Sequence, residues 1–473
     1  MSIDIYYNTD YLSALLEWNQ LEDCYKEQIK SKTTVYLPKT SGMVLDKKSG
    51  QNRYDAYLRR SNYYNHIKQT VSNSKNAIGR KPATIENLPE NMEYLKENFN
   101  SDGESLFSVL GDIYTEQMKL GRVGYLVDVI TDNKTFEVVR YKAQSILDWS
   151  FRRVDGVKTL EYVLLNEDIE TINAQGKTEQ SIIQRVLGLD YQNKYFTATF
   201  DKDESESIGD LKLNMNIENG LSSFEDKIIS PDFSGRQLNY IPFRVVNVDN
   251  LKMDIQQPPL LNQSNLSIGV YNADANHQAL VYLQTANMLF MTGVSESQFK
   301  NGFIGVDGVF YTDSTEAKAA YIGVSGEGLL ESRENLNELK IETGSFGVTV
   351  MEKNTQESEK SLQSRIQLQT DKLRDVSLSG AKLVQFLLNT ISLWMGGKGD
   401  IIVTGNTDFR TEQEKADELE KIYTVWSQNG MTNTDYWKWQ TKNLYTDLEF
   451  KEWELELNRK VNNDIDKTVN DDQ

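Results

Sequence analysis

The distribution of proline divides this chain into two unequal parts. All seven prolines lie at or before residue 259, and none follows in residues 260–473. Proline lacks a backbone N–H and breaks helix interiors and central strands, so its absence permits long helices in the second part. The pair Pro258-Pro259 is typical of a boundary between two such parts.

The first part has the pattern of a mixed α+β domain. Apolar residues at helical spacing predict helices over residues 11–30, 53–78 and 105–120. Short runs rich in β-branched and aromatic residues predict strands at residues 121–129, 136–141, 160–165, 181–190, 195–200 and 241–246. The stretch 201–230 is polar and acidic, which predicts a loop or an irregular hairpin.

The second part is predicted to be mostly helical. Helical spacing indicates helices over residues 261–291, 329–343 and 360–395, with a small glycine-rich β element at 302–310 between the first two. A helix over 360–395 would be about 54 Å long at the usual rise per residue, and Gly380 is the expected position of a kink. A short strand at 401–404 and acidic helices from residue 411 complete the chain.

Composition limits the classes of function. The net charge is −19, from 70 acidic and 51 basic residues, and no basic patch for tight phosphate binding stands out. This acidity fits a soluble surface, and it fits equally a surface that lies close to DNA without binding it. The single cysteine, Cys24, excludes an intramolecular disulfide and fits a reducing cytoplasm. We find neither a signal-peptide pattern nor an apolar run of membrane-spanning length.

Motifs for catalysis or metal binding are not found. The two histidines, His66 and His277, lie in different parts and belong to no ligand motif. The string 396–400 is rich in glycine and contains Lys398, but it lacks the first glycine and the Ser or Thr of a phosphate loop. The acids around Asp201 are more often solvated than bound to a divalent ion. We therefore expect no enzyme activity, no catalytic residue, no metal and no cofactor.

Several strings, taken in their order, resemble the portal proteins of tailed bacteriophages. The resemblance is to a branch of that family known mostly as a domain of unknown function, and it covers roughly residues 30–460. The strings are Tyr36-Leu37-Pro38-Lys39, Tyr54-Asp55-Ala56-Tyr57-Leu58-Arg59-Arg60-Ser61, Tyr63-Tyr64-Asn65, Gly121-Arg122-Val123-Gly124-Tyr125-Leu126-Val127-Asp128, Tyr141-Lys142-Ala143-Gln144-Ser145-Ile146-Leu147-Asp148-Trp149, Ile241-Pro242-Phe243, Pro258-Pro259-Leu260-Leu261, Asn265-Leu266 and Tyr271.

The resemblance implies the phage portal fold, an α+β fold with a mixed wing, long stem helices, a small β clip and a helical crown. The implied ranges are a wing at 1–260, a first stem helix at 261–292, a clip at 293–328, a second stem helix at 329–350, a channel loop at 351–359, a long kinked wing helix at 360–395 and a crown at 396–473 with a disordered acidic tail from about residue 462.

It also implies a non-enzymatic ring of identical subunits, usually a dodecamer, at one capsid vertex of the virion. Such a ring is assembled in the host cytoplasm and conducts double-stranded DNA during genome packaging and ejection, without sequence-specific binding. The implied partners are the terminase motor, the major capsid protein and the head–tail adaptor, with a scaffolding protein as a further candidate and no membrane.

Two sets of site residues follow from these ranges. A DNA-channel loop would contain Glu352, Lys353, Asn354, Gln356, Glu357 and Glu359. A clip surface for docking the motor and then the adaptor would contain Asn301, Phe303, Asp307, Phe310 and Tyr311. The competing interpretations are a solvated turn for the loop and the core of a local hairpin for the clip.

Two other classes of protein remain as alternatives. Another virion structural protein, such as a capsid or tail component, would be richer in strands and poorer in long proline-free helices. A phage DNA-processing enzyme, such as a nuclease or the packaging ATPase, would need a carboxylate cluster with metal spacing or a phosphate loop.

Overall fold

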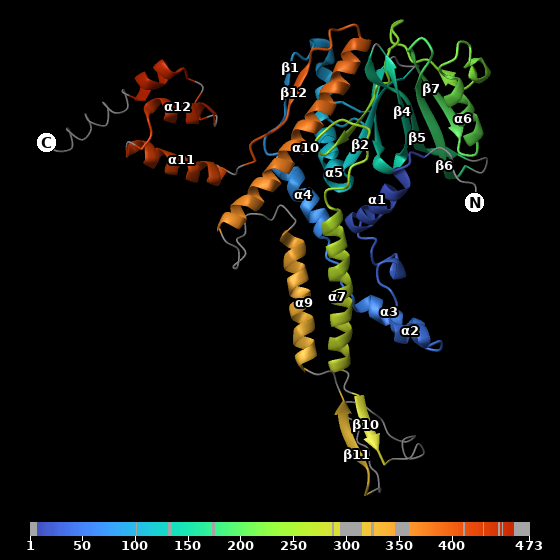
Figure 1. The fold of residues 1–473 in the computed structure, drawn as a ribbon, viewed down its shortest axis with the longest axis vertical. Coiled ribbons are helices and arrows are strands. Elements are labelled where there is room, and N and C mark those ends of the chain that lie inside the picture. The colour runs from blue at the N-terminus through green and yellow to red at the C-terminus, as the bar shows by residue number, and fades with distance from the viewer. Residues whose placement is uncertain are drawn as a thin grey trace, which may run out of the picture. The chain divides into compact units, whose positions relative to one another are not determined.

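The computed structural model describes residues 7–100, 102–130, 135–154, 156–172, 176–285, 288–293, 315–322, 326–345, 359–409, 412–428, 430–442, 445–446 and 448–457. The chain divides into two compact units, Met1–Thr407 and Asp408–Gln473. Helices and antiparallel sheets occur together in the first unit, so the α+β prediction is confirmed (Figure 1).

Two antiparallel sheets form the β part of the first unit. The smaller has the order β3 (Thr135–Lys142), β2 (Arg122–Ile130), β9 (Phe243–Asn247). The larger is a meander of β4 (Ile146–Val154), β5 (Val157–Ile172), β6 (Thr178–Leu189), β7 (Tyr195–Asp201) and β8 (Ile228–Ile229). The six strands predicted in the first part of the chain are therefore all present, whereas the β element predicted at 302–310 lies outside the described residues. Strand β4 was not predicted from periodicity, because it follows β3 after only one short turn.

An ionic network links the two sheets. The guanidinium of Arg185 on β6 pairs with the carboxylate of Asp128 on β2 and lies 3.3 Å from that of Glu167 on β5. The hydroxyl of Tyr141 on β3 donates to the same Glu167 carboxylate. These charges are largely buried but fully paired, which is the condition under which buried charges are tolerated.

The polar stretch 201–230 differs from its prediction as a loop or hairpin. It contains helix α6 (Ser205–Asn214) and the short strand β8. Ile208, Leu211 and Met215 follow helical spacing and are almost completely buried. The sequence analysis overlooked this short apolar stripe because acidic residues surround it. The stripe is the pattern that would have predicted the helix.

The N-terminal helices of the first unit are α1 (Tyr11–Tyr25), α2 (Ser41–Leu45), α3 (Gly50–Arg60), α4 (His66–Ile78) and α5 (Leu106–Leu120). Of these, α5 packs against strand β2 of the smaller sheet. The prediction of one helix over residues 53–78 is wrong, because α3 ends at Arg60 and a separate helix, α4, begins at His66. The side chain of Asn65 accepts from the backbone N–H of Lys68 at 2.9 Å and caps α4.

Helix α1 buries the face that carries Trp18 and leaves two of its leucines exposed. Ala14, Trp18 and Leu21 lie in the core, whereas Leu12 and Leu16 are 57% and 73% exposed. The large indole of Trp18 buries more apolar surface than a leucine can, so it selects which face of the helix turns inward.

A buried charge cluster joins α1 to α5. The ammonium of Lys119 lies 3.0 Å from the Glu22 carboxylate and 2.8 Å from that of Glu116. Burial raises the pKa of Glu22, but Lys119 and Lys26 more than offset this, so its net pKa lies below the usual 4.5. A carboxyl group with a lowered folded-state pKa stabilises the fold above its unfolded pKa and loses that contribution as the pH falls through the folded value.

We therefore expect Glu22→Gln to destabilise the protein at pH 7 and to do so much less below pH 4.5. Urea unfolding midpoints at pH 7 and pH 3.5 measure this difference, with Glu17→Gln on the same helix as the control. An equal loss of stability at both pH values would show that the charge of Glu22 does not act through this cluster.

The long helix α10 (Glu359–Trp394) confirms the third helix predicted in the second part of the chain. It is assigned as one continuous helix through Gly380, and the expected kink there stays a prediction. Glycine at this position allows a close approach, since a Cβ at residue 380 would lie 2.7 Å from a ring atom of Tyr114 on α5. Beside it, the Gln117 amide donates to the Ser379 hydroxyl at 2.7 Å and to the Asn247 carbonyl.

The segment Thr370–Trp394 of α10 is long and apolar enough to cross a membrane by length and composition alone. The sequence analysis expected no such segment. It missed this one because Ser, Thr and Gly residues interrupt its apolar run. Within that segment, 67% of the most apolar window is buried against the rest of the first unit. Packing of a core helix therefore accounts for its composition.

The boundary between the two units lies later than the expected start of the crown at residue 396. Strand β12 (Ile402–Thr404) pairs with β1 (Thr84–Glu86), and the Asn406 side chain donates to the carbonyl of Ile78. Residues 396–407 therefore belong to the first unit.

The second unit consists of α11 (Glu412–Ser427), α12 (Asn433–Lys442) and a further helix at 450–457. Its core is aromatic, with the rings of Trp426 and Tyr436 stacked 4.8 Å apart and Trp453 packed edge-on against Tyr436. The predicted disordered tail from residue 462 lies outside the described residues.

Candidate functional site

Two antiparallel helices, α7 (Leu261–Thr285) and α9 (Gly326–Ser345), pair side by side in the first unit (Figure 1). His277 on α7 and Ser332 on α9 share a hydrogen bond of 3.2 Å. Toward the other end, the Gln263 amide donates to the carbonyl of Thr343 at 3.1 Å. The face of α9 that is turned to α7 therefore carries Ser332, Leu336 and Thr343, of which the last two are buried.

An exposed flank of α9, away from its contact with α7, carries a line of carboxylates. Glu331, Glu334, Glu338 and Glu342 recur every three or four residues and are all exposed, and we call them the acidic stripe. Helix α9 contains only two basic residues, Arg333 and Lys340. Helix α7 by contrast has Asp274 as its one charged residue, so the negative charge of the pair is concentrated on one flank.

A two-stranded ribbon, β10 (Met288–Thr292) with β11 (Lys318–Ile322), lies in the chain between these helices. The predicted helix 261–291 therefore ends early, because residues 288–292 pair with β11 instead of extending α7. Among the described residues no third strand joins this ribbon. An isolated two-stranded ribbon is only marginally stable in water, so its unpaired edges are available for pairing.

The site residues predicted from sequence lie almost entirely outside the described residues. This holds for the clip residues Asn301, Phe303, Asp307, Phe310 and Tyr311, and for the loop residues Glu352, Lys353, Asn354, Gln356 and Glu357. Glu359 is the first residue of α10. The acidic stripe was missed by the sequence analysis, although the spacing of its glutamates at positions 331, 334, 338 and 342 is visible there.

The helix pair is anchored to the N-terminal helices by polar contacts. Asp274 on α7 is buried and accepts from the backbone and side-chain amides of Asn62 at 2.7 and 3.2 Å. The hydroxyl of Tyr57 on α3 donates to Asn276 at 2.7 Å, and the guanidinium of Arg60 lies 3.5 Å from the centre of the Tyr282 ring. These contacts fix α3 on the side of α7 away from α9 (Figure 1).

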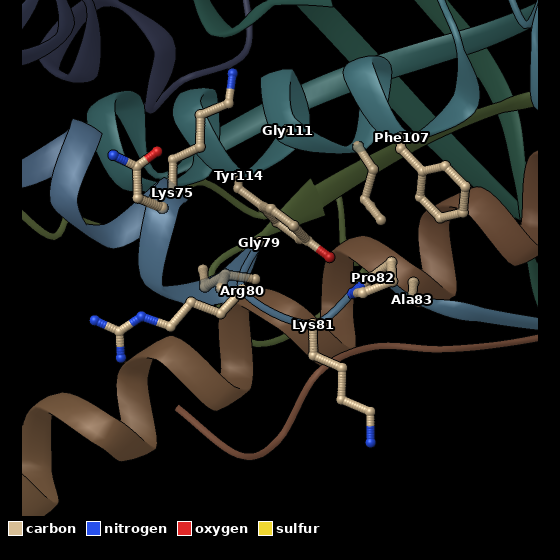
Figure 2. Close-up of a pocket in the computed structure, with 12 residues that line it drawn as sticks. Lys75, Gly79, Arg80, Lys81, Pro82, Ala83, Phe107, Gly111 and Tyr114 are labelled. Atoms are coloured by element: carbon tan, nitrogen blue, oxygen red, sulfur yellow. The ribbon is translucent and has the colours of Figure 1, made fainter. Parts of the chain in front are cut away.

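A cavity of about 290 Å³ lies between α4 and α5, lined by Lys75, Arg80, Lys81, Phe107, Tyr114 and neighbours. Figure 2 shows the charged ends of Lys75, Arg80 and Lys81 pointing in three different directions. The ammonium of Lys75 also lies 3.5 Å from the Asp112 carboxylate. A binding site needs polar groups that converge on one ligand, and this cavity lacks that arrangement.

Arg122, at the start of β2, has its guanidinium buried close to two indole rings. Its central carbon lies 5.1 Å from the ring centre of Trp149 and 6.0 Å from that of Trp18. Burial lowers the pKa of Arg122 to about 10, so the side chain stays cationic at neutral pH. Cation–π attraction thus helps to hold α1 on β4, and Arg122 has a structural role.

The two histidines have different surroundings. His277 joins α7 to α9, and burial lowers the pKa of His66 so that it stays neutral. In the part of the chain that the structure describes, no group of three or more His, Cys, Asp or Glu side chains could hold a metal ion. Glu204, one of the acids near Asp201, instead pairs with Lys227.

No family model matches this chain, and no curated protein matches it. Solved structures with some similarity include one described as the virion of a native gene transfer agent particle, at 10% identity and a TM-score of 0.39, covering 80% of this chain and 90% of that chain. A second, the neck of an empty particle of that kind computed with C6 symmetry, has 10% identity and a TM-score of 0.37, covering 80% and 88%.

A third is the neck of the native gene transfer agent particle computed with C12 symmetry, at 11% identity and a TM-score of 0.37, covering 78% of this chain and 86% of that chain. Because all three TM-scores lie below 0.5, we base neither the fold nor the function of this chain on these similarities. The portal resemblance of its sequence strings stays a hypothesis.

Proposed function

We propose that this chain is the subunit of a portal ring, a structural component of a phage-like virion that conducts double-stranded DNA into and out of the capsid. The ring binds the packaging motor first and the head–tail adaptor afterwards, within the vertex formed by the major capsid protein. The acidic stripe of α9 is the observation that carries this proposal.

A DNA channel has to let a polyanion slide past without holding it. Each lysine or arginine that reaches a phosphate adds salt-dependent affinity, whereas carboxylates repel the backbone. Rotational symmetry repeats the stripe Glu331–Glu342 once per subunit, so a ring would surround its axis with negative charge. The polar stretch 351–359 lies in the chain between the end of α9 at Ser345 and the start of α10, and we keep it as the narrowest part of the proposed channel.

The ribbon β10–β11 supports assembly into a ring. Its pairing is antiparallel, from Met288 with Ile322 to Thr292 with Lys318. A strand edge can be completed by the same ribbon of a neighbouring copy, and such a head-to-tail contact closes into a ring when the rotation per subunit allows it. We assign the ribbon and the residues between its strands to the clip, α7 and α9 to the stem, the sheets to the wing and the C-terminal unit to the crown.

Negative-stain electron microscopy of the purified protein tests this proposal. We expect closed rings with a central hole wide enough for duplex DNA, and class averages will give the number of subunits. Monomers or dimers at every concentration, together with divalent-metal-dependent DNA cleavage or ATP turnover, would refute the portal proposal and favour a DNA-processing enzyme. Open tubes or sheets would favour another virion structural protein.

A further inference from the structure

A short basic segment interrupts this acidic chain. Residues 39–60 contain six bases (Lys39, Lys47, Lys48, Arg53, Arg59, Arg60) and two acids (Asp46, Asp55), a net charge of +4. The rest of the chain then carries −19 minus +4, or −23. The sequence analysis did not single out this segment, because its bases are spread over two helices and the turn between them. We call residues 39–60 the basic projection.

The basic projection consists of α2, the turn after it and α3. In Figure 1 it reaches outward beside α7, on the side away from α9. Its tip exposes two adjacent apolar side chains, Val44 at 62% and Leu45 at 80%. Lys47 and Lys48 are exposed directly after them. Apolar and cationic groups thus lie together at one end of the first unit's N-terminal helices.

The projection is held in place by the rest of the unit. The Tyr54 hydroxyl donates to the Leu37 carbonyl at 2.8 Å in a buried contact, and Tyr57 and Arg60 contact α7 as described above. In the turn, the Asp46 carboxylate accepts from the backbone N–H of Ser49 at 2.9 Å. At Gly50 a Cβ would lie 2.0 Å from the Met43 carbonyl oxygen, so only glycine allows α2 to fold back on α3 this closely.

We propose that the tip of the basic projection, Val44, Leu45, Lys47 and Lys48, docks on an acidic surface of a second copy of this chain and forms part of the contact between neighbouring subunits. This rests on the proposed ring function, and it identifies one of its interfaces. An apolar pair held in place beside two lysines fits a protein partner better than nucleic acid alone, since phosphate contacts make no use of Val44 and Leu45.

Charge selects the second copy as the partner. The projection carries +4 and the remainder of the same chain −23, so every copy offers both halves of a complementary pair. The two halves are different surfaces, which makes the contact heterologous. A heterologous contact links subunits head to tail, as closure of a ring requires.

Two double variants separate the apolar and the ionic contributions. Val44→Ser with Leu45→Ser removes the apolar tip, and Lys47→Glu with Lys48→Glu reverses its charge. Because these side chains are exposed, the folded subunit should be retained, and circular dichroism and the thermal midpoint check this. The control is Lys202→Glu with Lys382→Glu, which makes the same change in charge at exposed positions elsewhere.

Mass photometry across a concentration series measures the fraction of subunits in rings. We expect each tip variant to need an about tenfold higher concentration for half-assembly, and the control to match the wild type. The defect of the charge variant should shrink as salt is raised to about 1 M, where exposed ion pairs are screened, while that of the apolar variant should persist.

The results distinguish this inference from the function on which it rests. If the wild type forms no rings, the proposed function fails. If the wild type forms rings and both tip variants assemble at the same concentration, the inference is refuted and the function stands. Normal assembly combined with loss of binding to a 30-base-pair duplex, or to vesicles of anionic lipid, would likewise overturn it and assign the tip to nucleic acid or to a membrane.

Discussion

Replacing Glu331, Glu334 and Glu338 with lysine is expected to turn a ring that releases duplex DNA into one that retains it. The three side chains are exposed on the flank of α9 away from its contact with α7, so the change should leave the helix pair intact. Each new lysine–phosphate contact should add about 0.9 to the salt dependence of the logarithm of the binding constant. Fluorescence polarisation of a labelled duplex at several salt concentrations measures both affinity and slope.

The matched control replaces the same glutamates with glutamine. It removes the repulsion without adding attraction, so we expect a small rise in DNA affinity and a slope close to that of the wild type. In a packaging reaction the lysine variant should slow translocation more than the glutamine variant. Unchanged DNA affinity in the lysine variant would place the acidic stripe away from the channel and would remove the main support for the proposed function.

The second large effect concerns stability, and it is expected for Trp394→Ala at the end of α10. The indole is fully buried, its N–H donates to the Arg236 carbonyl at 3.0 Å, and its ring lies against those of Phe136 and Tyr195. Truncating a buried aromatic side chain costs about 3–5 kcal/mol in free energy of unfolding, and the lost hydrogen bond adds ~1 kcal/mol.

Leu393→Ala at the adjacent position serves as the control, because Leu393 is 41% exposed. We expect it to cost less than about 1 kcal/mol, since surface substitutions are usually small. Urea unfolding followed by near-ultraviolet circular dichroism and by tryptophan fluorescence measures both variants. Equal losses of unfolding free energy in the two variants would show that the buried contacts of Trp394 do not stabilise the core.

Local sequence patterns predicted most of the elements, and they failed where long-range packing decides. Helices α5, α9 and α10 have stripes long enough to be recognised without their partners. The sequence suggested only a kink as the use of Gly380, whereas the position of Tyr114 on α5 shows that glycine there also allows a close approach between two helices. The predicted end of α7 was wrong because the apolar run 288–292 fits a helix and a strand equally well. Its pairing with β11 shows that it is a strand.

The same division holds for the candidate sites. The chain by itself determined a mixed first part, long proline-free helices after residue 259 and a strongly acidic composition, since proline, periodicity and charge act over a few residues. Only the tertiary structure decided that four glutamates of α9 line up away from α7, and that Val44 and Leu45 are exposed beside Lys47 and Lys48. Which face of a helix meets solvent depends on what packs against the other face, and that information lies in distant parts of the chain.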